Sequence, residues 1–132
     1  MLDFSPLQKA LATLAEALAA AKERPGDLFV RDAAIQRFEY SYELCIKSLR
    51  RQLEAMADSP SQIDGLGYKD MLRLALERKL LANTAPWFVF RELRNITSHT
   101  YDASKAERVF AGLPQFLRAA KSLDTALRKV NR

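Results

Sequence analysis

The segment RELRNITSHTYD, residues 91–102, concentrates side chains that can do phosphate and acid–base chemistry. It holds His99, the one histidine of the chain, five positions after Arg94. An arginine can bind a phosphate and neutralise charge that develops in a transition state. A histidine titrates near neutral pH and can move protons in the same reaction. The pair therefore has the parts needed to cleave an RNA phosphodiester bond through the 2′-hydroxyl.

Several side chains around this pair are polar and can form hydrogen bonds with a substrate. In this interpretation Arg94 and His99 are the candidate catalytic residues, with the phosphate at Arg94 and proton transfer at His99. Asn95 and Arg91 could orient the substrate, and Tyr101 could donate a hydrogen bond to a base or stack on one. We therefore expect a composite site in which catalytic and binding residues come from one short stretch.

Helical geometry, if it continues to Asp102, would arrange these side chains in two neighbouring stripes. One stripe would hold Arg91, Arg94, Ser98 and Tyr101, and the other would hold Asn95, His99 and Asp102. A five-residue separation places Arg94 and His99 about 140° apart around an ideal helix. One chain would present the pair awkwardly to one phosphate, whereas a two-fold dimer would bring two copies of each residue into a shared groove. We therefore expect a homodimer.

Two simpler interpretations of the segment remain open. A histidine, an arginine and an asparagine near a helix carboxyl end can satisfy its carbonyl groups and favour its dipole. A metal site is a weaker alternative, because the lone histidine has no cysteine partner, no H-E-x-x-H pattern and no paired carboxylates. We expect neither a metal ion nor an organic cofactor.

The apolar periodicity predicts the helices that must position the segment. We expect helices over Ser5–Lys22, Phe29–Met56 and Tyr68–Leu81, a fourth capped by Asn83 or Thr84, and a fifth from about Ala103 to the carboxyl end. Asp27 or Asp32 can cap the second helix, and Pro114 should bend or split the last one. Without alternating strand patterns, the expected fold is all-α, an antiparallel up-and-down bundle of four to five helices forming one domain over residues 1–132.

Composition limits the classes of protein to which the chain can belong. It has 132 residues, 48% of them apolar, and a formal net charge of +5, which favours polyanionic or acidic partners. Cys45 is the single cysteine and lies on an apolar helix face, so an internal disulfide is impossible and a reduced, cytoplasmic setting is expected. No apolar run is long enough to cross a bilayer. We therefore expect no membrane contact and no secretion.

Two blocks of sequence together resemble a known family. QRFEYSYELCIK, residues 36–47, combined with WFVFRELRNITSHTYD, residues 87–102, resembles the HEPN superfamily. The most similar branch is the nucleotidyltransferase substrate-binding proteins, which accompany a minimal nucleotidyltransferase in bacterial toxin–antitoxin pairs. The resemblance implies an all-α, dimeric, HEPN-like bundle. In active members it implies a metal-independent ribonuclease whose motif is an arginine, four to six residues, and a histidine.

That motif can be carried over to single positions of the chain. Arg94, the four residues NITS and His99 match it, and Asn95 matches the polar residue that often follows the arginine. Active toxins of this branch have a tyrosine two places beyond the histidine, matched here by Tyr101. The resemblance implies that a partner nucleotidyltransferase attaches AMP to this tyrosine and so silences the toxin. Bulk and negative charge added there would exclude an RNA backbone.

Glu39 and Glu43 in the first block also look like family positions, but the resemblance assigns them no catalytic role. From helical spacing, Glu43 is expected to pair with Lys47 four residues later. Three hypotheses follow for the chain. It is a ribonuclease toxin with an RNA substrate and a nucleotidyltransferase antitoxin, a non-catalytic substrate-binding subunit of that nucleotidyltransferase, or a helical adaptor in which Arg94 and His99 are dispensable.

Overall fold

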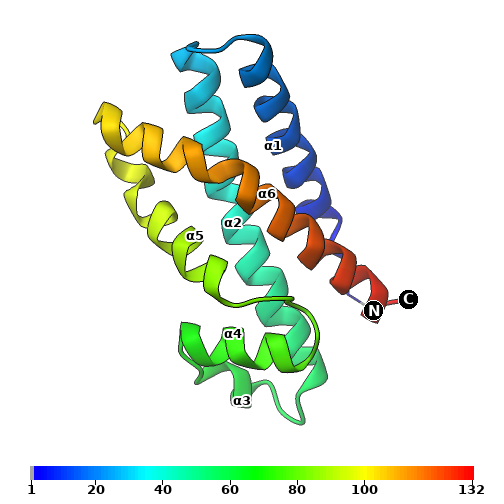
Figure 1. Ribbon diagram of the computed structural model, residues 1–132. Coiled ribbons are helices and arrows are strands. Elements are labelled where there is room, and N and C mark those ends of the chain that lie inside the picture. The colour runs from blue at the N-terminus through cyan, green and yellow to red at the C-terminus, as the bar shows by residue number, and fades with distance from the viewer. Residues whose placement is uncertain (1) are drawn as a thin grey trace.

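The computed structural model describes residues 2–132, and this part of the chain is built from helices without strands. Figure 1 shows the helices in chain order. Their bounds are α1 Ser5–Glu23, α2 Leu28–Met56, α3 Ser61–Asp64, α4 Tyr68–Glu77, α5 Ala85–Ile96, the 3-10 turn η1 Thr97–His99, and α6 Ala103–Val130. The all-α prediction is confirmed. Five of these helices are the expected ones, and α3 is an additional single turn in the connection after α2.

The turn between α1 and α2 has a clear local cause. Gly26 takes a φ of 82°, a left-handed conformation that glycine adopts without steric cost. Asp27 then caps α2, because its carboxylate accepts hydrogen bonds from the amides of Phe29 and Val30. Of the two expected caps, Asp27 is thus the one used. The tight turn makes α1 and α2 antiparallel neighbours (Figure 1).

Helix α4 ends earlier than the sequence predicted, at Glu77 and not at Leu81. Lys79 has a φ of 61°, and the amide of Leu80 donates to the carbonyl of Ala75 at 2.9 Å. This left-handed closure satisfies the last carbonyl groups of the helix. It also turns Leu80 and Leu81 into the core, where both are buried. Burial of the two leucines explains why the apolar pattern continued beyond the helix itself.

Helix α6 runs unbroken from Ala103 to Val130 with Pro114 inside it, so the expected split of this helix is wrong. Proline removes one backbone hydrogen bond and crowds the preceding turn. Here Pro114 faces solvent, while Leu113 and Phe116 on either side of it are fully buried. Their packing offsets the local cost and keeps the helix continuous.

The helices meet around a cluster of aromatic side chains centred on Phe116. Its ring centroid lies 4.9 Å from that of Phe38, 5.2 Å from Phe90 and 6.2 Å from Trp87, all in edge-to-face arrangements. Such geometry is favourable for aromatic quadrupoles. Trp87 is 2% exposed and is therefore a packing anchor at the start of α5. The cluster therefore holds α2, α5 and α6 together, and α5 and α6 are the helices on either side of the His99 turn.

Close packing of α6 on α5 further fixes that turn. A Cβ atom added at Gly112 would lie 2.5 Å from Cδ1 of Leu93, closer than carbon atoms tolerate. Any larger residue at this position would force the buried Leu93 side chain to shift, so Gly112 suits the close approach of the two helices. At another contact of α6, Arg31 near the start of α2 forms an ion pair with Glu107 near the start of α6. The distance from Nη1 to Oε1 is 2.9 Å.

We expect Phe116→Ala to destabilise the protein by about 3–5 kcal/mol, because a buried phenyl ring leaves a cavity that neighbouring rings fill only in part. Urea unfolding followed by circular dichroism measures this loss. Phe29→Ala is the matched control, since Phe29 is 90% exposed. Its expected effect is below about 0.5 kcal/mol. Equal losses for the two variants would contradict the packing of the aromatic cluster.

Candidate functional site

The segment RELRNITSHTYD does not form one helix. Helix α5 ends at Ile96, η1 covers Thr97–His99, and α6 starts at Ala103. The hydroxyl of Thr97 donates to the carbonyl of Arg94 at 2.7 Å, in competition with the backbone ladder. The expected pair of helical stripes is therefore wrong, and the 140° separation of Arg94 and His99 does not apply.

Asp102 also has a different role from the one expected. Its carboxylate caps α6 by accepting hydrogen bonds from the amides of Ser104 and Lys105. Its hydrogen bonds with the Ser104 side chain and the Lys105 amide lower the pKa of this carboxyl group. Asp102 thus starts α6 and holds the turn after His99 in place, instead of joining a polar face on α5.

Arg94 points from the end of α5 towards α2. Its Nε donates to Oε1 of Glu43 at 3.1 Å, and Nη2 also contacts Glu43. Nη1 donates to the hydroxyl of Thr97 at 3.1 Å, and Oε1 of Glu39 lies 3.8 Å from Nη2. The guanidinium is therefore held in one orientation by two carboxylates and a hydroxyl, while 29% of the side chain stays exposed.

Glu43 is the residue that sequence reasoning placed wrongly. No ion pair joins it to Lys47 anywhere in the part of the chain that the structure describes, and its partner is Arg94 instead. Glu39 and Glu43 lie one helical turn apart on the face of α2 that meets α5. Their shared face and their position in the first family block were the available signals, but the partner on α5 depends on the tertiary fold.

His99 and Tyr101 project from the turn between α5 and α6. Their ring centroids are 6.2 Å apart, and Tyr101 is 87% exposed. The carbonyl groups at the end of α5 are satisfied by hydroxyl groups, since Thr97 bonds to Arg94 and Thr100 bonds to Thr97. Within residues 2–132 the imidazole makes no hydrogen bond. The imidazole therefore satisfies no carbonyl group at the helix end, although His99 lies in the last turn of η1, and the ring is accessible from solvent.

Arg91 lies in a different environment from Arg94. Its guanidinium sits over the ring of Tyr68, 4.7 Å from the centroid. The Tyr68 hydroxyl donates to the carbonyl of Trp87 and accepts from Tyr42, each at 2.8 Å. Burial raises the pKa of both tyrosines, so they remain neutral hydrogen-bonding groups. The fold thus separates Arg91 from the His99 turn and places it on a fixed aromatic ring.

The remaining predicted positions lie on the exposed faces of α5 and α2. Asn95 is exposed on α5 between Arg91 and His99. Tyr40 of α2 hydrogen-bonds to Thr13 of α1, so it faces away from Glu43, whose partner lies on α5. Residues 2–132 include no group of three or more His, Cys, Asp or Glu side chains arranged to hold a metal ion. None of the helices described has the length and apolarity needed to cross a membrane.

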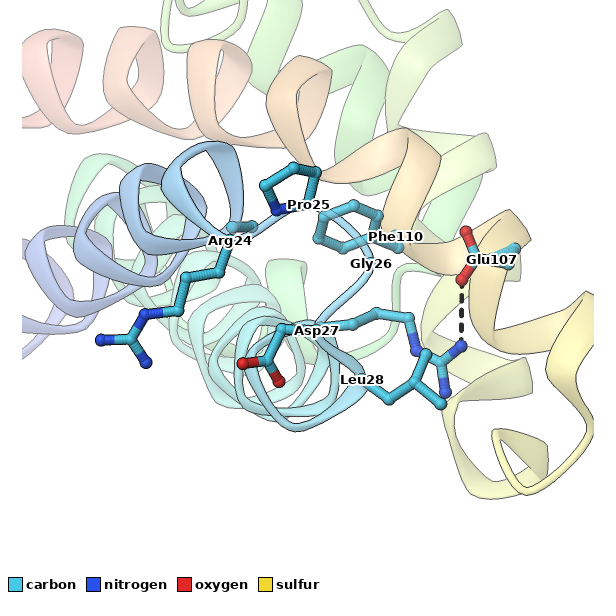
Figure 2. Close-up of a pocket in the computed structure, with 9 residues that line it drawn as sticks. Arg24, Pro25, Gly26, Asp27, Leu28, Glu107 and Phe110 are labelled. Carbon is cyan, nitrogen blue, oxygen red and sulfur yellow. Dashed lines mark hydrogen bonds and ion pairs between the residues drawn. The ribbon is translucent and has the colours of Figure 1, made fainter.

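A separate hollow lies at the turn between α1 and α2 (Figure 2). It has a volume of 210 Å³, and its walls include Pro25, Leu28 and Phe110. The dashed line at Glu107 in Figure 2 marks the ion pair with Arg31. None of the predicted site residues lines this hollow. The hollow lies near the starts of α2 and α6, at the same end of the bundle as the His99 turn (Figure 1).

Comparison with known proteins places this geometry in a family. The model of the family described as nucleotidyltransferase substrate binding protein like matches residues 2–129. A probable ribonuclease HepT from Haemophilus influenzae is 44% identical over 98 residues, which are 74% of this chain and 67% of that protein.

Two solved structures are similar along nearly the whole chain. The first, from Haemophilus influenzae, is described as the fold of a substrate-binding domain of a nucleotidyltransferase. It is 35% identical, has a TM-score of 0.90, and the match covers 96% of this chain and 99% of that one. A protein from Thermus thermophilus is 35% identical with a TM-score of 0.75, over 92% and 98% of the two chains. The chain belongs to the nucleotidyltransferase substrate-binding protein family, the branch of the HEPN superfamily that its two sequence blocks predict.

Proposed function

We propose that the protein is a HEPN endoribonuclease, the toxin of a toxin–antitoxin pair. The observation that supports this most directly is the turn after α5, where threonine hydroxyls satisfy the helix end and leave the His99 imidazole without a structural partner. A histidine kept accessible, five residues along the chain from a fixed arginine, is suited to proton transfer. The relationship to a protein named as a probable ribonuclease adds to this argument.

In this proposal Arg94 binds the scissile phosphate and His99 transfers protons. The 2′-oxygen attacks phosphorus and gives up its proton, the bond from phosphorus to the 5′-oxygen breaks, and that oxygen receives a proton. The products are a 2′,3′-cyclic phosphate and a 5′-hydroxyl. Glu43 and Thr97 hold the guanidinium in place, so little reorganisation is needed when negative charge develops on the phosphate. Asn95 and Arg91 contribute to substrate binding.

The reaction requires both a base and an acid, whereas each chain carries one histidine. A two-fold dimer would supply one from each protomer. The exposure of His99 at the end of the bundle is compatible with such a shared groove. We therefore propose a homodimer as the active form.

We propose a nucleotidyltransferase as the partner that silences the toxin. The Tyr101 phenol attacks the α-phosphorus of ATP bound to that enzyme, so an oxygen–phosphorus bond forms, pyrophosphate leaves, and the phenolic proton passes to a base. Tyr101 is 87% exposed and its ring lies 6.2 Å from that of His99, which suits both access and inhibition. AMP there adds negative charge beside the position proposed for the RNA backbone.

A second candidate function is a non-catalytic subunit that binds substrate for the nucleotidyltransferase. One observation favours it: two carboxylates and a hydroxyl already surround the Arg94 guanidinium, as in a structural ion-pair network. In that case Tyr101 would be presented to the partner without any nuclease activity in this chain.

The proposed function is tested with purified protein, without its partner, and total RNA in the presence of a chelator. We expect cleavage that leaves 2′,3′-cyclic phosphate ends, because the attacking group is the neighbouring 2′-hydroxyl. Once a site is mapped, a 2′-O-methyl group at that nucleotide should abolish the cut, while the same group one nucleotide away should not. Intact RNA in all reactions would favour the accessory subunit.

A further inference from the structure

A groove runs along α2 beside the Arg94 ion pair, between α2, α5 and the start of α4. Its walls include Tyr42, Glu43, Lys47, Arg50, Tyr68 and Arg91, and its volume is 580 Å³. We propose that this α2–α5 groove binds the unpaired RNA strand that flanks the cleaved bond. The proposal rests on the proposed function and defines its substrate as single-stranded at the site.

Charge in the groove favours a polyanion. Lys47, Arg50 and Arg91 line it together with one carboxylate, that of Glu43, which is already paired with Arg94. Within residues 2–132, none of the three cations has a carboxylate oxygen within 4.0 Å. Some arginines elsewhere are already engaged, as Arg31 and Arg108 are by glutamates. The groove therefore has cations that phosphates can engage without first displacing a protein carboxylate.

The spacing of these residues fits a nucleic acid backbone. Glu43, Lys47 and Arg50 follow each other at four and three residues, so they share one face of α2. Seven residues of helix extend about 10 Å, a length comparable to about three stacked nucleotides at about 3.4 Å each. Because Glu43 both lines the groove and contacts Arg94, one end of the groove opens at the proposed phosphate site.

An aromatic platform in the groove favours an unpaired strand over a duplex. Tyr68 is fixed by hydrogen bonds to Tyr42 and Trp87, and the Arg91 guanidinium lies over its ring. The Arg91 side chain is exposed, so a base can stack on the face of its guanidinium that is turned away from Tyr68. Bases inside a duplex already stack on their neighbours and have no face to offer.

The test measures binding of a short single-stranded RNA to the His99→Ala protein over a range of salt concentrations. The variant Lys47→Gln/Arg50→Gln is compared with Arg118→Gln/Lys121→Gln, which removes two exposed cations of α6. The slope of log K against log salt is negative, and each lost phosphate contact reduces its magnitude by about 0.7 for a single strand, so we expect the magnitude to fall by about 1.4. The α6 variant should keep the parental slope, and equal slopes for both variants would overturn the proposal.

Three further measurements separate phosphate binding in the groove from effects of local packing, strand type and assembly. Arg50→Lys keeps the charge and should keep the slope, although it loses the hydrogen bond to the Ile63 carbonyl. A duplex of the same sequence should bind more weakly than the single strand, and tighter binding of the duplex would contradict the single-strand assignment. A change in sedimentation of Lys47→Gln/Arg50→Gln would assign the groove to a subunit interface and overturn the proposal.

Failure of the proposed function would be distinguishable from failure of this inference. The His99→Ala background measures binding without cleavage. If RNA binding depended on Lys47 and Arg50 but the wild-type protein did not cut RNA, the proposed nuclease activity would be contradicted and the proposed groove would not. If the protein cut RNA but its RNA binding did not change when Lys47 and Arg50 were replaced, the proposed groove would be contradicted and the proposed nuclease activity would not.

Discussion

The protein with His99→Ala is expected to cleave RNA about 10²–10⁴-fold more slowly than the wild type, the range by which a positioned acid or base accelerates proton transfer. In a two-fold dimer the substitution removes both histidines and therefore both proton-transfer groups. Cells that express the variant without the partner should consequently grow normally, while those expressing the wild type should stop growing. Cleavage rates of purified proteins and growth curves measure the two effects.

A matched control separates chemistry from folding in this experiment. Ser98→Ala changes the exposed neighbour of His99 in the same 3-10 turn. It should leave cleavage and toxicity at wild-type levels. Thermal unfolding should give the same midpoint for both variants, since the His99 imidazole makes no hydrogen bond within residues 2–132 that the fold could lose. Wild-type cleavage by His99→Ala would exclude the proposed role of this residue.

The same experiment decides between the nuclease and the accessory subunit. Equal growth and intact RNA with both the wild type and His99→Ala would contradict the toxin and favour a binding subunit. Toxicity that disappears only in the variant would contradict the accessory role and also the helical adaptor. Each outcome therefore removes at least one of the three hypotheses.

Tyr101→Phe is expected to abolish AMP transfer to this protein, because the substitution removes the one atom that attacks ATP. The reaction needs the purified nucleotidyltransferase and ATP labelled at the α-phosphate. Wild-type protein should become labelled and lose its nuclease activity, whereas the variant should stay unlabelled and active. Tyr101 is 87% exposed, so removing its hydroxyl group should not alter folding.

Tyr40→Phe is the control for this second prediction, since Tyr40 is also partly exposed but its hydroxyl is bonded to Thr13. It should be labelled and silenced like the wild type. Label on Tyr101→Phe at the wild-type level would show that the modified position lies elsewhere. Silencing of Tyr101→Phe without label would show that the partner inhibits by binding and not by AMP transfer.

Sequence patterns were most informative where a short-range physical rule applies. The helical periodicity predicted α1, α2 and α6 to within a few residues, because apolar spacing reflects which face is buried. Asp27, one of the two expected caps of α2, begins that helix for a similarly local reason. The two family blocks predicted the fold class and the family, which the comparisons confirm.

Errors arose where contacts between distant segments decided the outcome. Local spacing paired Glu43 with Lys47, but the packing of α5 on α2 brings Arg94 to Glu43 across 51 residues. Pro114 was expected to bend or split α6, yet burial of Leu113 and Phe116 keeps that helix continuous. A local rule estimates the helix propensity of one segment at a time. Tertiary packing adds stabilising free energy from contacts with other segments, which such a rule leaves out.

The sequence by itself determined which residues can do chemistry, because arginine, histidine and tyrosine carry their charge, proton affinity and hydroxyl group into any fold. It could not determine how they are presented. The tertiary structure decided that α5 ends before His99, that Glu43 holds Arg94, and that Arg91 lies over Tyr68. Orientation depends on partners from other helices, and only packing brings those partners within hydrogen-bonding distance.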